Sequence, residues 1–190
     1  MKLLHLEEGK PASIMSIGSR PWLVRERLSY ELDDLEPVLG KDAMKYHYNK
    51  LHKGYVEKYN ASEGDPDFNE AGAFLHNVLF PQFKKPVSGS RPHGISSSLI
   101  MAHFESFENF KDKFKEVAMA IQGSGWVYLS KSGEIKTIRN HEIKNDILLL
   151  VDWWEHAWAL DYQADKKKYL ANTWKIIDWK VINGLLGQGS

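Results

Sequence analysis

The sequence of 190 residues contains no cysteine, which excludes disulfide bonds, thiolate metal sites and cysteine nucleophiles. A transition metal bound by this chain must therefore be held by nitrogen and oxygen ligands. Neither sign of charge is in excess, because 25 basic and 25 acidic residues give a net charge of zero. The chain thus lacks the electrostatic signature of a nucleic-acid or membrane-surface protein, and neither partner is expected.

Long apolar runs are also missing. Runs such as 147–151 are far shorter than the roughly 20 residues of a membrane-spanning helix. Residues 1–15 are interrupted by His5, Glu7 and Glu8, so they lack the continuous apolar stretch of a secretory signal. We therefore expect a soluble, cytoplasmic protein, and its apolar content of 43% is enough for a hydrophobic core.

The N-terminal part of the chain has the pattern of a helical hairpin. Apolar residues spaced by threes and fours predict an amphipathic helix over about 41–60. A Gly-Asp-Pro cluster at 64–66 interrupts the pattern, and a second helix is predicted over about 66–79. Together these helices predict a hairpin lobe at 28–85, preceded by an irregular lead segment at 1–27 to which no function is assigned.

The C-terminal part has a mixed pattern. Residues 86–94 are rich in Pro, Gly and Ser and are predicted to link the hairpin to a second lobe at 95–190. Phenylalanines from Phe104 to Phe114 predict one helical stretch that ends at 123–125. Strands are predicted at 126–129, 134–138 and 147–152, with helices after them. The predicted fold class is α+β: an N-terminal helical hairpin, then a lobe with a small antiparallel sheet flanked by helices.

Four side chains form the most informative pattern. Asp152 and His156 are four positions apart among tryptophans, including Trp154, and supply two metal ligands in a setting with little water. His47 lies on the first predicted helix and His76 on the second. Taken alone, a histidine on an apolar helix face is more often a hydrogen-bonded core residue, and Asp152 would cap a helix. Their conjunction favours a metal site.

In order and spacing these segments resemble the iron/manganese superoxide dismutase family. Supporting motifs occur at 35–37, 68–69, 104–114, 123–126, 162–163 and 174–179, and the resemblance spans about 28–183. It implies that one iron or manganese ion per subunit is bound by His47, His76, Asp152 and His156. It also implies that superoxide is the substrate, converted to dioxygen and hydrogen peroxide. The departures at His141 and Gly72, described below, give a slight preference for iron.

The resemblance assigns further roles around the ion. Tyr55 matches a tyrosine at the mouth of the substrate channel, and Trp126 and Trp154 match rings that wall the metal pocket. Glu155 matches a carboxylate that reaches across a dimer interface to the partner's ligand histidine. A homodimer, or a tetramer built from it, is therefore expected.

Several positions depart from the family pattern. His141 stands where a glutamine commonly bonds the metal-bound solvent, and we expect His141 to take that role; Gly72 occupies the alternative position of this glutamine. Leu51 and Ala159 replace a histidine and a tyrosine that pair across the interface. Their loss leaves a second interpretation open, a superoxide-dismutase-like metal-binding or structural protein with little turnover. His52 is expected not to bind metal.

Overall fold

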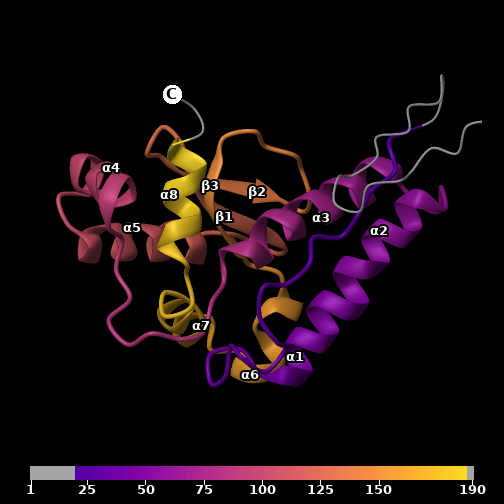
Figure 1. Ribbon diagram of the computed structural model, residues 1–190, viewed down its shortest axis with the longest axis horizontal. Coiled ribbons are helices and arrows are strands. Elements are labelled where there is room, and N and C mark those ends of the chain that lie inside the picture. The colour runs from indigo at the N-terminus through magenta and orange to yellow at the C-terminus, as the bar shows by residue number, and fades with distance from the viewer. Residues whose placement is uncertain (1–19, 188–190) are drawn as a thin grey trace, which may run out of the picture.

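The computed structural model describes residues 20–187, and its N-terminal half is a helical hairpin (Figure 1). The hairpin consists of α1 (Lys41–Tyr46), the π-helical turn η1 (His47–His52), α2 (Lys53–Asn60) and α3 (Pro66–Leu79). Helix α3 begins where the sequence predicts, because the Asp65 side chain accepts a hydrogen bond from the Phe68 N–H and Pro66 occupies the first turn.

The first predicted helix, 41–60, is continuous but not a regular α-helix. Residues His47–His52 are wound as a π-helix, and the Lys53 N–H bonds the Tyr48 carbonyl five residues earlier. This wider turn is a correction to the regular amphipathic helix that the sequence predicts over about 41–60. Periodicity alone does not reveal one extra residue in a turn, and such turns often occur at functional sites.

The C-terminal half combines helices with a small sheet. Its elements are α4 (Gly94–Phe104), α5 (Phe107–Met119), β1 (Gly125–Ser130), β2 (Ile135–Arg139), β3 (Ile147–Asp152), the 3₁₀ turn η3 (Glu155–Ala157), α6 (Ala159–Tyr162), α7 (Lys166–Thr173) and α8 (Trp179–Gly187). The single helical stretch predicted around Phe104–Phe114 is wrong. Glu105 adopts a left-handed conformation (φ 66°), and the Ser106 hydroxyl caps a new helix by accepting the Asn109 N–H at 3.0 Å.

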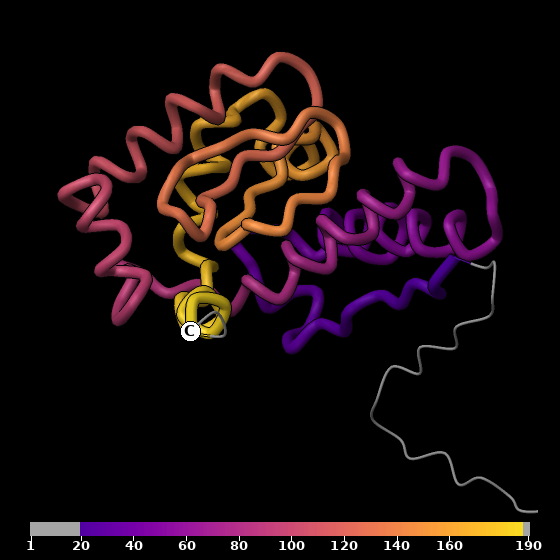
Figure 2. Tube along the Cα trace, turned by 90° about the horizontal axis from the view of Figure 1, so that it is seen from above, coloured from indigo at the N-terminus to yellow at the C-terminus, as the bar shows by residue number. Residues whose placement is uncertain are grey.

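The three predicted strands form one antiparallel sheet in the order β2-β1-β3, which confirms the α+β class. Strands β1 and β3 are buried along their whole length. Gly133 makes the turn between β1 and β2 with φ 86°, a conformation that favours glycine. Figure 2 shows the hairpin on one side of the sheet and α4 and α5 on the other. The register places Trp126 of β1 opposite Asp152 at the end of β3.

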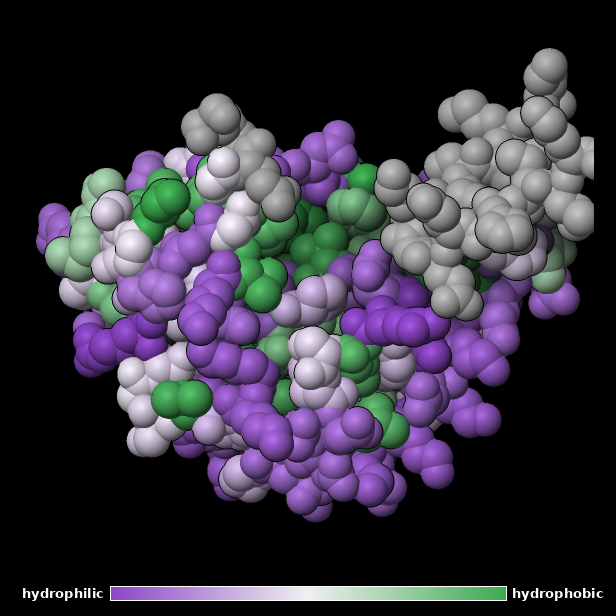
Figure 3. Space-filling view, viewed as in Figure 1, coloured by the Kyte–Doolittle hydropathy of each residue, from purple (hydrophilic) through white to green (hydrophobic). Residues whose placement is uncertain are grey.

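The two halves share one hydrophobic core. Leu75 and Leu79 of α3 belong to the same buried cluster as Leu149 of β3. The 3₁₀ turn η2 (Phe80–Gln82) also joins the halves, because the Gln82 side chain accepts the Leu150 N–H at 2.9 Å. Hydrophilic residues cover most of the face in Figure 3, and hydrophobic ones gather over the region between α8 and α3. The division into lobes at 28–85 and 95–190, with a linker at 86–94, stays a prediction.

No helix within residues 20–187 combines the length and the apolar character that a membrane-spanning segment requires. Of the lead segment predicted at 1–27, residues 1–19 lie outside the described part. Residues 20–27 lie against the hairpin, where Leu23 and Glu26 make backbone hydrogen bonds to its side chains.

Candidate metal centre

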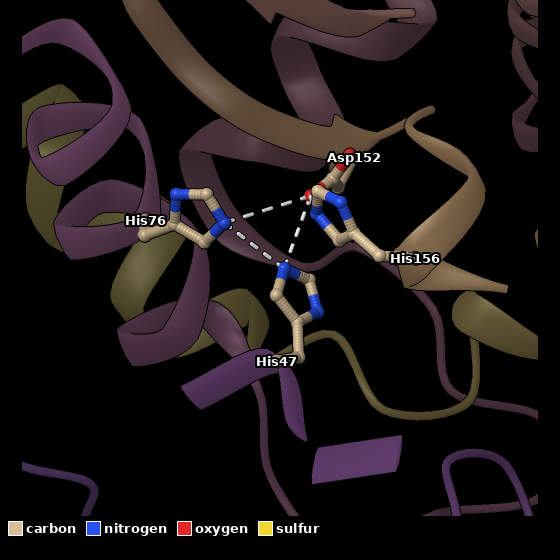
Figure 4. Close-up of side chains that lie close together, drawn as sticks. All are labelled: His47, His76, Asp152 and His156. Carbon is tan, nitrogen blue, oxygen red and sulfur yellow. Dashed lines mark hydrogen bonds and ion pairs between the residues drawn. The ribbon is translucent and has the colours of Figure 1, made fainter. Parts of the chain in front are cut away.

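Four side chains from distant segments point toward one another (Figure 4). His47 begins η1, His76 lies on α3, Asp152 ends β3 and His156 lies in η3. Asp152 Oδ2 is 3.1 Å from His47 Nε2, 3.1 Å from His156 Nε2 and 3.8 Å from His76 Nε2. His47 Nε2 and His76 Nε2 are 3.0 Å apart. The fold thus brings together the four residues predicted as ligands.

Hydrogen bonds at the far side of two of these groups fix which atoms face inward. His76 Nδ1 donates to the Gly72 carbonyl at 2.6 Å, so the lone pair of the neutral ring is on Nε2. Asp152 Oδ1 accepts the Trp154 N–H at 2.8 Å, which leaves Oδ2 for the centre. His76 and Asp152 therefore aim unprotonated donor atoms at a shared point.

Burial sets the charge of this group. It lowers the pKa of His47 and lowers the pKa of His76 well below its usual range, the latter with a further contribution from His47. For Asp152 burial raises the pKa, but the adjacent His156 and His47 outweigh it, so the pKa lies well below the usual range of a carboxyl. At neutral pH the ionised carboxylate of Asp152 therefore lies beside the neutral imidazoles of His47 and His76.

The arrangement fits a single metal ion. If donors lie about 2.1 Å from a shared ion at angles of about 90–120°, neighbouring donors are roughly 3.0–3.6 Å apart. The four ligand atoms all lie within 4.8 Å of one another, and the shorter separations match that range. Three nitrogens and one oxygen suit a transition metal better than calcium or magnesium, which prefer oxygen. Within residues 20–187 no other group of this kind occurs.

His141 lies beside this centre in a defined orientation. Trp126 Nε1–H donates to the Asn140 carbonyl at 3.0 Å and to His141 Nδ1 at 3.2 Å. Because Nδ1 accepts, the neutral ring carries its proton on Nε2. Burial lowers the pKa of His141 to about 4, which keeps the ring neutral at pH 7. Its Nε2 is buried and has no hydrogen-bond partner among residues 20–187, so one donor remains available.

Aromatic rings enclose His141 and the ligands. The Trp154 ring stacks on His141 at 4.6 Å between centroids and lies 5.7 Å from His156. The Trp126 ring meets His76 edge-on at 5.1 Å. Both tryptophan rings thus lie against histidines of the four-residue group, and their role as walls of a metal pocket stays a prediction.

Gly72 makes room for two of these rings. A Cβ atom at Gly72 would lie 2.9 Å from the Tyr55 ring and 3.2 Å from His141 Cδ2. The Tyr55 and His141 ring centroids are 4.9 Å apart. Burial, with a contribution from Asp152, raises the pKa of Tyr55 to about 12, so its hydroxyl is protonated at neutral pH. The sequence shows that Gly72 lacks a polar side chain, but only the structure shows what fills that space.

His52 lies next to the four-residue group, at a position that the sequence did not predict. It is fully buried and stacks on His76 of the four-residue group at 5.4 Å between centroids. Asn77 and the Ala73 backbone are nearby, but neither ring nitrogen of His52 makes a hydrogen bond of good geometry with any described residue. His52 is not part of the four-residue group. Nothing in the sequence shows whether His52 is buried or lies at the surface.

His52 predicts a pH dependence of stability. Burial, with a contribution from Arg25, lowers its pKa to about 3, whereas the unfolded chain takes up the proton near pH 6.5. Between these values the unfolded state binds more protons, so stability falls as pH falls. In metal-free protein, His52 should lower the free energy of unfolding by on the order of 2 kcal/mol between pH 7 and pH 5. Denaturant unfolding measures this effect. The drop in the free energy of unfolding between pH 7 and pH 5 should be smaller by this amount in His52→Leu than in wild type, and unchanged in the control His103→Leu, which replaces an exposed histidine.

The sequence also predicts a role for Glu155, next to His156. Glu155 is exposed, and with Tyr46, His156, Ala159 and Leu160 it lines a surface hollow of about 380 Å³. Tyr46 is 45% exposed and Leu160 60% exposed, and both line this hollow, so they form an apolar patch rather than isolated exposed residues. His156 of the four-residue group thus borders an apolar hollow at the surface of the single chain.

Fold and site together define a mononuclear metalloprotein whose ligands come from a helical hairpin and from an α+β lobe. The family model for the C-terminal domain of the iron/manganese superoxide dismutases matches residues 92–185, and the model for their alpha-hairpin domain matches residues 25–73. The chain therefore belongs to the iron/manganese superoxide dismutase family.

Curated relatives agree with this assignment. The superoxide dismutase (Fe) of Plasmodium malariae is 31% identical over 183 residues, which cover 83% of this chain and 92% of the relative. The superoxide dismutase (Mn/Fe) of Porphyromonas gingivalis is 34% identical over 182 residues, covering 82% and 94%. The superoxide dismutase (Fe) of Pyrobaculum aerophilum is 32% identical over 181 residues, covering 80% and 86%.

Proposed function

We propose that this protein is a superoxide dismutase that binds one iron or manganese ion through His47, His76, Asp152 and His156. The convergence of these four donor atoms within 4.8 Å carries the proposal. Relatives named as iron and as manganese/iron enzymes support either ion. We retain the slight preference for iron that His141 and Gly72 gave at the level of sequence.

The net reaction converts two superoxide anions and two protons into one dioxygen and one hydrogen peroxide. The bound ion would supply the one-electron chemistry by alternating between its trivalent and divalent states. The ionised Asp152 offsets only part of the ion's charge, so the centre attracts a small anion. The rings of Trp126 and Trp154 limit the water around it.

Protons are the second requirement of the reaction, and two groups are placed to hold them. His141 carries its proton on the buried Nε2, in an orientation held by the Trp126 N–H. Tyr55, with a pKa raised to about 12, keeps its hydroxyl proton at neutral pH. We propose that His141 bonds the solvent at the centre and that Tyr55 lies at the mouth of the channel.

Elemental analysis combined with a superoxide-decay assay tests the function. Protein purified from its own host should contain about one iron or manganese per chain, and its activity should be lost on metal removal and regained on reloading. A full complement of metal without turnover would favour the alternative, a metal-binding protein of this fold. Absence of bound metal would favour a structural role.

We also propose a homodimer in which Glu155 of each subunit reaches His156 of the other. The apolar hollow beside His156 and the exposure of Tyr46 and Leu160 support a covering partner surface. Sedimentation velocity measures the oligomeric state of the protein in solution. A monomer would contradict the proposal, and a tetramer would require a second interface. Cytoplasmic location stays a prediction, which fractionation of host cells tests.

If Leu51 and Ala159 meet across this dimer interface, substitutions at the two positions should affect its stability together. Restoring only the histidine, in Leu51→His, would leave a polar ring without its tyrosine partner, at a cost of about 1–3 kcal/mol if the ring is buried. The double variant Leu51→His with Ala159→Tyr should therefore be more stable than Leu51→His. Thermal unfolding of both dimers tests this, and equal losses would show that the two positions do not interact.

A further inference from the structure

Residues 23–26, called the strap below, lie along the helical hairpin, in indigo beside α2 and α3 in Figures 1 and 2. The strap is held by side chains rather than by a strand partner. Asn60 Oδ1 accepts the Leu23 N–H at 2.9 Å, and Asn60 Nδ2 donates to the Leu23 carbonyl at 2.9 Å. One amide side chain thus satisfies both backbone groups of Leu23.

The other bonds of the strap involve the residue that follows each of the two helical ligands. Tyr48 follows His47, and its hydroxyl donates to the Glu26 carbonyl at 2.6 Å. Asn77 follows His76; its Oδ1 accepts the Glu26 N–H at 2.8 Å and its Nδ2 donates to the Val24 carbonyl at 2.9 Å. A single backbone unit, Glu26, is therefore bonded to both helices directly beside the ligands.

Arg25 adds a third link, to the π-helical turn itself. Its Nη1 donates to the Tyr48 carbonyl at 2.9 Å and to Asn49 Oδ1 at 3.1 Å. The guanidinium carbon lies 3.9 Å from the centroid of the Tyr48 ring, a cation–π contact. The Tyr48 carbonyl also accepts the Lys53 N–H that closes the wide turn. Arg25 thus holds a carbonyl on which the winding of η1 depends.

We propose that the strap is a brace that sets the separation of His47 and His76, and that Arg25 is a positioning residue for His47. The inference rests on the proposed metal centre. The two ligand nitrogens are 3.0 Å apart and belong to different helices. A brace bonded beside both ligands limits the independent movement of those helices, and a positively charged donor with two acceptors makes stronger hydrogen bonds than a neutral one.

The rate at which excess EDTA removes Mn²⁺ from loaded protein tests the proposal. Loss of partners that orient metal ligands typically costs about 10–100-fold in metal affinity. Arg25→Leu should release Mn²⁺ at least about tenfold faster, and Arg25→Lys, which keeps the charge and one donor, should lie between it and wild type. The matched control is Arg27→Leu, an exposed arginine next to the strap, which should release Mn²⁺ at the wild-type rate.

Hydrogen exchange of the metal-free protein provides a readout independent of the ion. Amides of 47–53 should exchange faster in Arg25→Leu, while those of β1 and β3 stay protected. If Arg25→Leu does not fold, Tyr48→Phe takes its place, since it removes only the hydroxyl bond to Glu26 and should speed Mn²⁺ release about threefold. If Arg25→Leu, or Tyr48→Phe in its place, releases Mn²⁺ at the wild-type rate, the inference is overturned. Failure of wild-type protein to bind Mn²⁺ or iron would instead refute the proposed metal centre.

Discussion

Replacing Asp152 with asparagine is expected to remove the bound metal and, with it, superoxide-dismutating activity. Asp152 is the only anionic member of the four, and its Oδ2 is 3.1 Å from both His47 and His156. An asparagine side chain can still accept the Trp154 N–H, but it presents no negative charge to the ion. Because loss of outer-shell partners alone costs about 10–100-fold, loss of this ligand should weaken metal binding by about 100-fold or more.

Metal content after dialysis, measured beside superoxide decay, checks this result. Asp146→Asn is the matched control, because Asp146 accepts hydrogen bonds from Tyr128 and Lys136 but lies outside the four-residue group. It should retain metal and activity. An Asp152→Asn protein with full metal content and wild-type turnover would show that the ion is bound elsewhere.

Replacing His141 with alanine is expected to lower activity about 100-fold while metal content stays near that of wild type. None of the four donor atoms belongs to His141, so its loss leaves the ligands in place. What disappears is the proton on Nε2, which is oriented by the Trp126 N–H. Removing a positioned proton donor typically costs about 10²–10⁴ in rate.

His141→Gln should recover part of the activity, because its amide can again donate a hydrogen bond. His103→Ala is the control, since it removes an exposed histidine that lies outside the four-residue group. Wild-type activity in His141→Ala would reduce His141 to a turn residue after β2. Loss of metal in that variant would indicate a structural role for the ring instead.

Sequence patterns predicted most of the fold because they report local physics. Helix α3 follows from its Asp65 cap and Pro66, and Gly133 makes the turn between two of the predicted strands. The same patterns missed the break at Glu105, because Phe104 and Phe107 continue the helical spacing across it. They also missed the π-helical turn, because one extra residue hardly changes the apparent period.

By itself the sequence determined the chemistry available to this protein: no thiolates, three histidines and one aspartate in family order, and a histidine at 141 with glycine at 72. The tertiary structure decided the rest. It brought the four donors within 4.8 Å, placed the proton of His141 on Nε2 through Trp126, and bonded Arg25 to the turn that begins with His47. These contacts join residues that local periodicity cannot relate, because the partners are separated by 15 or more positions along the chain and meet only when the chain folds.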